Sequence, residues 1–130
     1  MDAIWRGINA KKRVKMLPKI NNIKDLETQI NKIIYPKLIQ QINKDFDLAG
    51  IDYVFDTKQI VPVFTEEFID VIAQIVSKRF ALFLNLLYRI DINEDKIRMI
   101  IQSNTDDIYK QIAFEILKRE WQKVWFRLNY

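Results

Sequence analysis

The chain lacks both cysteine and histidine among its 130 residues. Without cysteine it has no disulfide and no catalytic thiol, which is compatible with the cytoplasm. Without histidine it cannot build Ser-His-Asp or Cys-His machinery, or supply the imidazole ligands of most catalytic zinc sites. We therefore expect a cytoplasmic protein that is not an enzyme, uses no cofactor or metal and has no small-molecule substrate.

Glycine and proline are scarce, at two and three residues. So few turn-forming residues argue against a β architecture with many tight turns. Two isolated glycines also cannot supply a loop that cradles phosphate groups. No membrane span is expected, because Asp70, Lys78 and Arg79 interrupt the longest apolar run.

Charge is unevenly distributed along a chain that has enough hydrophobic residues, 49%, for one folded domain. Residues 1–19 carry +5, residues 20–117 carry −4 and residues 118–130 carry +3, which gives the net charge of +4. Two basic ends around an acidic middle suit a polyanionic partner or an acidic protein.

The longest apolar stretch, residues 65–90, contains neither glycine nor proline. Its polar residues recur mostly four positions apart, so they form one narrow line on a helix. Such a helix would be roughly 39 Å long and apolar over most of its circumference, so other elements must surround it. We predict that residues 65–90 form the central helix of the fold, with Leu84 and Leu87 nearly fully buried.

Before this stretch, residues 23–48 show apolar positions every four residues, interrupted by Pro36. Either one helix kinks near Tyr35, or a second helix starts with Pro36 in its first turn. Gly50 is typical of a residue that ends a helix in the left-handed conformation. Residues 51–64 include Pro62 between aromatic and β-branched residues, and a short hairpin or an extended linker fits them equally well.

After the apolar stretch, Asn93 is expected to cap a short helix that reaches about Ser103. Thr105 is expected to cap a long final helix, with Asp106 and Asp107 in its first turn. The sequence therefore predicts an all-α fold, a small helical bundle. It consists of a basic N-terminal arm at residues 1–22 and a single helical domain at residues 23–130.

Two motifs in the second half of the chain resemble those of small helical bacterial proteins, an uncharacterised family. One is the run from Asn85 to Lys96, which contains Leu-Tyr-Arg-Ile-Asp, and the other is the run from Lys118 to Lys123. The resemblance covers residues 65–130 and implies a shared helical domain, without implying an activity.

Acidic residues offer one motif for a metal. The segment from Asp91 to Asp95 has the D-x-N-x-D spacing that opens a calcium loop. The loop then needs glycine at its sixth position and glutamate at its twelfth, where this chain has Lys96 and Gln102. Helix capping explains these residues, so we expect no calcium site.

The final helix presents the most informative surface. Its aromatic residues gather at one border, and Arg119, Lys123 and Arg127 form a stripe four residues apart. Aromatic residues beside cations suit an acidic protein partner or a nucleic acid. The alternative is that the rings close the edge of the core and the cations face solvent.

We predict a non-catalytic interaction or assembly module that binds another protein and forms a homo-oligomer. The expected partner-binding residues are Trp5, Phe114, Trp121, Trp125 and Phe126. The alternative is a nucleic-acid-binding protein that uses both basic ends. Its polyanion-binding residues would be Lys11, Lys12, Arg13, Lys15, Arg119, Lys123 and Arg127.

Overall fold

The computed structural model describes residues 16–130, and the regular elements of this part of the chain are all helices. They are α2 (Ile23–Gln29), α3 (Ile34–Leu48), α4 (Val61–Lys78), α5 (Phe80–Ile90), α6 (Glu94–Ser103) and α7 (Ile108–Asn129). The helices pack against one another around a shared hydrophobic core. The prediction of an all-α helical bundle is therefore confirmed, while most of the expected N-terminal arm lies outside the described residues.

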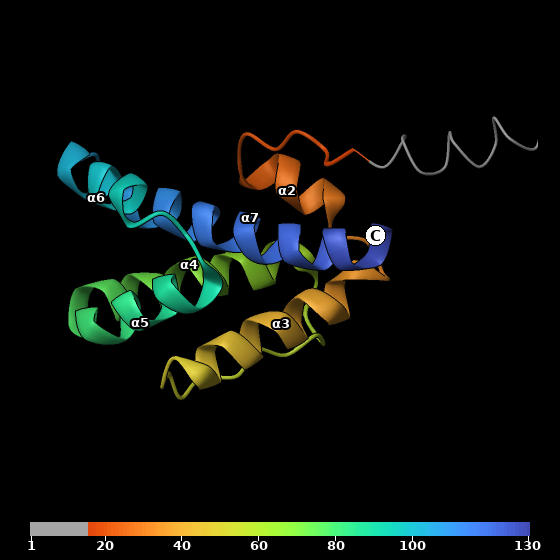
Figure 1. Cartoon of the computed structure of the whole chain (residues 1–130), viewed down its shortest axis with the longest axis horizontal. Helices are drawn as coiled ribbons and strands as arrows, with labels where there is room; N and C mark the ends of the chain where they lie inside the picture. Colours follow the sequence, from red (N-terminus) through yellow and green to blue (C-terminus); the bar gives the residue numbers. More distant parts are fainter. Residues whose placement is uncertain (1–15) are drawn as a thin grey trace, which may run out of the picture.

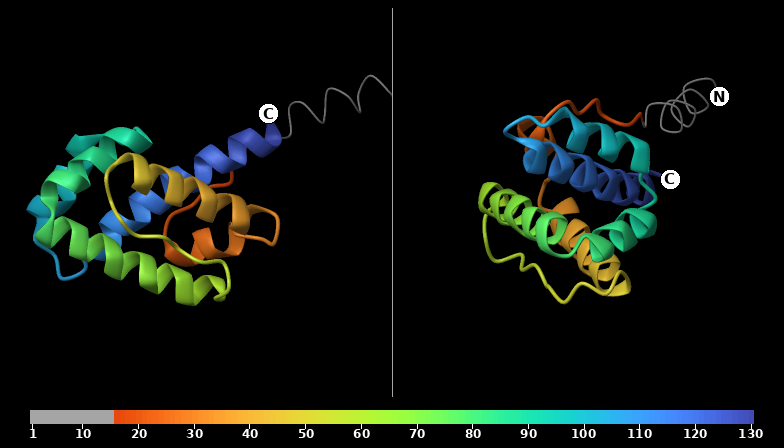
Figure 2. Two further views of the ribbon diagram at one scale, coloured as in Figure 1. Left: turned by 90° about the horizontal axis from the view of Figure 1, so that it is seen from below. Right: turned by 90° about the vertical axis from the view of Figure 1, so that its left-hand side faces the viewer.

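The central helix is α7 (Figure 1). It runs through the middle of the bundle and packs against α3, α4, α5 and α6. Figure 2 shows the same arrangement from below and from one end. Buried residues of α7 extend from Ile112 to Trp125, so this helix is covered along most of its length.

The single central helix expected at residues 65–90 is instead two helices. Arg79, with φ −141° and ψ 59°, separates α4 from α5. Its N–H donates to the Ile75 carbonyl at 2.9 Å and its carbonyl accepts from the Phe83 N–H at 3.1 Å, so the chain turns within one residue. The turn lets α4 and α5 both pack against α7.

Proline and glycine mark helix boundaries as expected. Pro36 lies in the first turn of α3, so the alternative of a second helix is correct, and Asn31 accepts hydrogen bonds from the N–H groups of Ile33 and Ile34. Gly50 has φ +86° and ends α3 with a Schellman pair of hydrogen bonds. In that pair Gly50 N–H donates to Asp47 at 3.0 Å and Ile51 N–H to Phe46 at 2.9 Å.

Residues 51–60 form an extended linker between α3 and α4, and the structure has no strand in the part of the chain that it describes. The Asn43 side chain fixes this linker by bonding both the N–H and the carbonyl of Phe55, at 2.8 and 3.0 Å. The Tyr35 hydroxyl donates to the Gln59 carbonyl at 3.0 Å. The hairpin alternative fails because α4 already starts at Val61, with Pro62 in its first turn, where the missing N–H costs no hydrogen bond.

Polar residues begin the last two helices. Asn93 caps α6 as predicted, accepting from the Asp95 N–H at 2.9 Å. The prediction for Thr105 is wrong, because α7 starts later, at Ile108, with Asp107 at the N-cap position. Thr105 instead donates to the Asp107 carboxylate at 3.3 Å, and Gln111 donates to the same oxygen at 2.7 Å.

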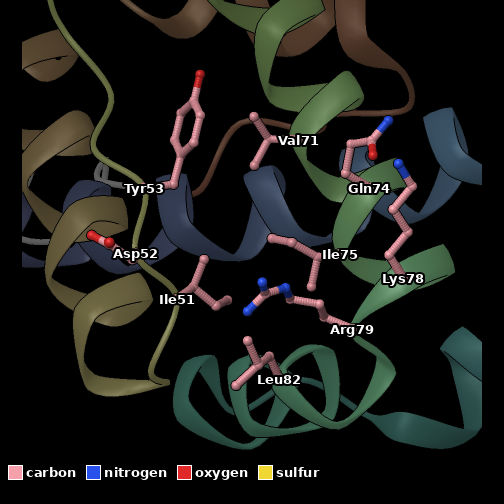
Figure 3. A pocket seen from close by; sticks show the side chains of 9 residues that line it. All are labelled: Ile51, Asp52, Tyr53, Val71, Gln74, Ile75, Lys78, Arg79 and Leu82. Carbon is pink, nitrogen blue, oxygen red and sulfur yellow. The ribbon is translucent and has the colours of Figure 1, made fainter.

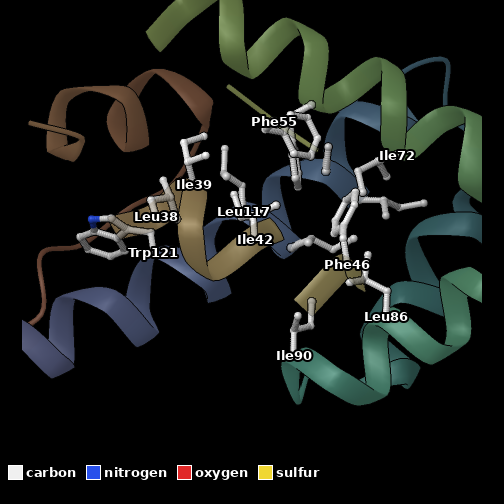
Figure 4. Close-up of a cluster of buried hydrophobic side chains, with 14 of the residues drawn as sticks. Leu38, Ile39, Ile42, Phe46, Phe55, Ile72, Leu86, Ile90, Leu117 and Trp121 are labelled. Atoms are coloured by element: carbon white, nitrogen blue, oxygen red, sulfur yellow. The ribbon is translucent and has the colours of Figure 1, made fainter. Parts of the chain in front are cut away.

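Four buried phenylalanine rings connect α3, the linker and α4 in the core. Figure 4 shows two of them, Phe46 of α3 and Phe55 of the linker. They are Phe46, Phe55, Phe64 and Phe68, with neighbouring ring centroids between 5.4 and 6.3 Å apart. Tilted and edge-to-face contacts of this kind add to the stabilisation that burial of the rings provides. The linker is thus part of the core, because Phe55 lies in the middle of this cluster.

Leu84 and Leu87 test the orientation of α5. Leu87 is 1% exposed as predicted, but Leu84 is 37% exposed, so the prediction for Leu84 is wrong.

We expect Leu87→Ala to lower the free energy of unfolding by about 2–5 kcal/mol through lost burial and a cavity. Leu84→Ala, which empties no core site, should cost less than about 1 kcal/mol. Urea unfolding of both variants measures the difference, and equal losses would contradict this orientation of α5.

Candidate functional site

The aromatic residues expected to bind a partner do not share one exposed surface. Trp121 is fully buried and Trp125 is nearly so, which places both in the core of the single chain. The alternative that the rings close the edge of the core therefore describes Trp121 and Trp125, and partner binding by the aromatic set stays a prediction. Phe114 is half-buried with the Lys118 ammonium 5.6 Å from its ring centre, whereas Phe126 is 44% exposed. Trp5 lies outside the described residues.

The basic stripe of α7 is used within the chain. Arg119 donates to the backbone carbonyl of Asp91 at 3.3 Å and lies 3.7 Å from its carboxylate. Lys123 is largely buried and meets two carboxylates, and Arg127 donates to the Gln41 side chain at 2.7 Å. Each cation therefore fixes α7 to a neighbouring segment. The other predicted polyanion-binding residues, Lys11, Lys12, Arg13 and Lys15, lie outside the described residues.

A buried polar cluster joins α3 to α7. Lys123 Nζ lies 3.2 Å from Asp45 Oδ2 and 3.2 Å from Glu120 Oε1. The Gln41 amide donates to Asp45 Oδ2 at 2.9 Å and links the cluster to Arg127. Glu120 is 1% exposed, and neither of its oxygens has a partner with hydrogen-bond geometry among the described residues. One ammonium thus faces two carboxyl groups.

Burial, and after it the nearby Asp45 carboxyl, together raise the pKa of Glu120 from about 4.5 to about 9. Lys123 opposes this rise. We conclude that Glu120 keeps its proton at neutral pH. The cluster then holds one carboxylate against one ammonium and is neutral overall.

Paired carboxyl groups with different pKa values are the elements of acid–base catalysis. Here both carboxyl groups are buried, so a substrate cannot reach them. The pair was missed in the sequence because its members are 75 positions apart, on α3 and α7. The available signal was Glu120 itself, which the helical period places on the inward face of the final helix. No group of acidic residues in the part of the chain described is arranged to hold a metal ion.

A groove of about 370 Å³ lies beside this cluster, between α3 and α7. Its lining includes Lys37, Lys44 and Arg127 but no acidic side chain. None of these three cations takes part in an ion pair among residues 16–130. The groove therefore concentrates positive charge on one face of the bundle.

An apolar stripe on α5, which we call the α5 face, is exposed. It consists of Phe80, Leu84 and Tyr88, at 48%, 37% and 81% exposure. The residues follow one another at intervals of four and so lie on one side of the helix, while Phe83, Leu86, Leu87 and Ile90 face the core. The α5 face therefore presents three large, partly exposed apolar side chains on one side of the helix.

Comparison with known protein families finds no match, and no curated protein or solved structure shows significant similarity to the chain. The resemblance of residues 65–130 to small helical bacterial proteins stays a prediction. Within residues 16–130, the helices are too short or too polar to cross a lipid bilayer.

The buried carboxyl group predicts a dependence of stability on pH. The pKa of Glu120 is about 9 in the folded chain against about 4.5 otherwise, so the folded chain keeps a proton that the unfolded chain releases. Stability is fully present below about pH 4.5 on this account and is lost as the pH rises toward about 9. The free energy of urea unfolding should be lower at about pH 8.5 than at about pH 5.5, a range in which no histidine titrates.

Glu120→Gln should largely remove this decrease, because an amide does not titrate. Glu115→Gln is the matched control, since Glu115 is another buried glutamate of α7, paired with Lys96 at 2.8 Å. The Glu115→Gln variant should show the same decrease in the free energy of unfolding between about pH 5.5 and about pH 8.5 as the unaltered chain does. A decrease of the same size in Glu120→Gln would show that Glu120 is not its source.

Proposed function

We propose that this chain is a non-catalytic helical module that associates with a second copy of itself through the α5 face. The observation that supports the proposal is the exposure of Phe80, Leu84 and Tyr88 along one side of α5. Burying the exposed part of these side chains would remove apolar area from water.

The α5 face is suited to a two-fold symmetric contact. Along α5 its side chains are an aromatic ring, a leucine and a second aromatic ring. The order of side-chain types is therefore nearly the same in either direction along the helix. When two copies pair in antiparallel orientation, Leu84 meets Leu84 on the symmetry axis and Phe80 meets Tyr88 of the partner. A symmetric dimer requires such a self-complementary surface. The small side chain of Ala81, on the same side of the helix, permits close approach.

The expected strength of this contact is low. The α5 face spans about 12 Å along the helix, which is short compared with stable interfaces. We therefore expect a dimer that dissociates at concentrations on the order of 10 µM. The lack of charged side chains in the stripe keeps the cost of removing it from water small.

The first test is the molecular mass in solution. Sedimentation from about 1 to 200 µM should show a shift from the 15.7 kDa chain toward twice that mass. Leu84→Glu should abolish the shift, because it places two like charges against each other on the symmetry axis. Val54→Glu is the control, since Val54 is an exposed apolar residue of the linker and should leave association unchanged.

Phe126→Ser separates the α5 face from the aromatic surface predicted from the sequence. Phe126 is exposed near the C-terminal end of α7, with its ring centre 5.2 Å from that of Trp125. If Phe126→Ser dissociates the dimer and Leu84→Glu does not, the interface lies at that end of α7. A chain that stays monomeric at the highest concentration would contradict self-association altogether.

Binding of a nucleic acid is the second candidate function, and the α3–α7 groove favours it. Lys37 and Lys44 are exposed, two turns apart on α3, and Arg127 faces them from α7. This groove differs from the stripe predicted from sequence, because Arg119 and Lys123 are held by Asp91 and by the buried cluster. The groove lining holds these three spaced cations and no acidic side chain, an arrangement that suits contacts with successive phosphate groups of a nucleic acid.

The test is binding of a fluorescent single-stranded oligonucleotide at several salt concentrations. The double variant Lys37→Gln, Lys44→Gln should bind more weakly and should lower the slope of log affinity against log salt by about 1.4. The control Lys58→Gln, Lys110→Gln removes the same charge outside the groove and should lower the slope less. No binding at low salt, or equal slopes in both double variants, would exclude the groove.

A further inference from the structure

A pocket of about 450 Å³ lies where α4 ends and α5 begins (Figure 3). Three segments enclose it: the start of the linker at residues 51–53, the last two turns of α4 and the first turn of α5. Its volume falls in the range of pockets that bind small molecules. It is separate from the buried carboxyl cluster and from the α3–α7 groove, because it shares no lining residue with either.

The walls of this junction pocket are apolar. Ile51 and Ile75 are buried, and Val71 and Leu82 are half-buried. In Figure 3, Ile51 comes from the linker on one side, Ile75 from α4 on the other, and Leu82 of α5 closes the lower end. The break at Arg79 produces this enclosure, because it turns α5 across the end of α4. The pocket therefore offers a surface for an aliphatic or aromatic group.

Two cations stand at the same pocket. The Arg79 guanidinium projects between Ile51 and Ile75, whereas the Lys78 side chain at the end of α4 runs toward Gln74, away from that guanidinium (Figure 3). Within residues 16–130, neither cation has an ion pair or a side-chain hydrogen bond, and the Gln74 amide at the rim has none either. The positive charge is thus available to a ligand.

The acidic lining residue does not cancel this charge. Asp52 carries the one carboxylate of the lining, and Figure 3 shows it pointing away from α4 and from Arg79. The Tyr53 hydroxyl also points away from the pocket and donates to Glu67, a bond that raises the pKa of Tyr53 to about 12. The interior consequently combines apolar walls with an unpaired guanidinium.

We propose that the junction pocket binds a small amphiphilic anion. The anionic group, a carboxylate or a phosphate, pairs with Arg79, and Lys78 adds positive charge at the rim. The apolar part lies against Ile51, Val71, Ile75 and Leu82. Arg79 is exposed at the pocket, and a guanidinium donates two parallel, charge-assisted hydrogen bonds to either anionic group. The ligand must also carry an apolar group, because a bare inorganic ion would leave the apolar walls uncovered.

Methyl-resolved NMR of the full chain tests this proposal with four probes below their micelle-forming concentrations. Octanoate and octyl phosphate should each shift the methyl signals of Ile51, Val71, Ile75 and Leu82, and the tighter binder identifies the preferred anionic group. Octyltrimethylammonium has the same chain with the opposite charge, and acetate has the charge without the chain. Neither should shift these signals at the same concentration.

Arg79→Gln should weaken the binding of octanoate and octyl phosphate about tenfold, and Lys78→Gln should weaken it by a smaller factor. Arg89→Gln is the matched control, an exposed arginine on α5 outside the pocket, and should bind as the unaltered chain does. The remaining methyl signals report whether each variant is folded. Equal binding of octyltrimethylammonium, absence of shifts with both anions, or unchanged binding in folded Arg79→Gln would each overturn the proposal.

Discussion

The length of α7 constrains the rest of the fold. Residues 61–90 are mostly apolar, and as one straight helix they would extend about 45 Å. The 22 residues of α7 extend only about 33 Å, so part of such a helix would project past its partner with its apolar surface in water. The turn at Arg79 removes this conflict by folding the second half back against α3 and α7. The junction pocket and the α5 face both result from that turn.

Charged groups as well as apolar ones hold α7 in place. Lys123 neutralises the Asp45–Glu120 pair against α3, and Lys96 of α6 meets the buried Glu115. A buried ion pair such as Lys123–Asp45 adds little net stability, because both charges lose their hydration. Removing one partner is costly, however, so such pairs specify which faces of the helices meet. The predicted basic stripe of α7 is thus mainly a means of positioning the helix.

Local signals in the sequence were sufficient for the fold class and for several helix ends. Pro36, Gly50 and Asn93 act through their own backbone or their nearest neighbours, so their roles can be read from a few residues. The break at Arg79 has no such signal, because neither glycine nor proline is near it and its cause is the length of a distant helix. The helical period likewise places Glu120 on the inward face of α7, where it is buried, but its neighbour Asp45 depends on how α3 and α7 pack.

The break between α4 and α5 can be measured directly by NMR of the backbone amides. The structure predicts that Arg79 has a non-helical Cα chemical shift and that the amides of Ala81 and Leu82 exchange quickly with solvent. These amides belong to the first turn of α5, where N–H groups have no acceptor within the helix. A helical shift at Arg79 with slow exchange at both amides would instead show one continuous helix. That result would contradict the enclosure of the junction pocket and the orientation of the α5 face.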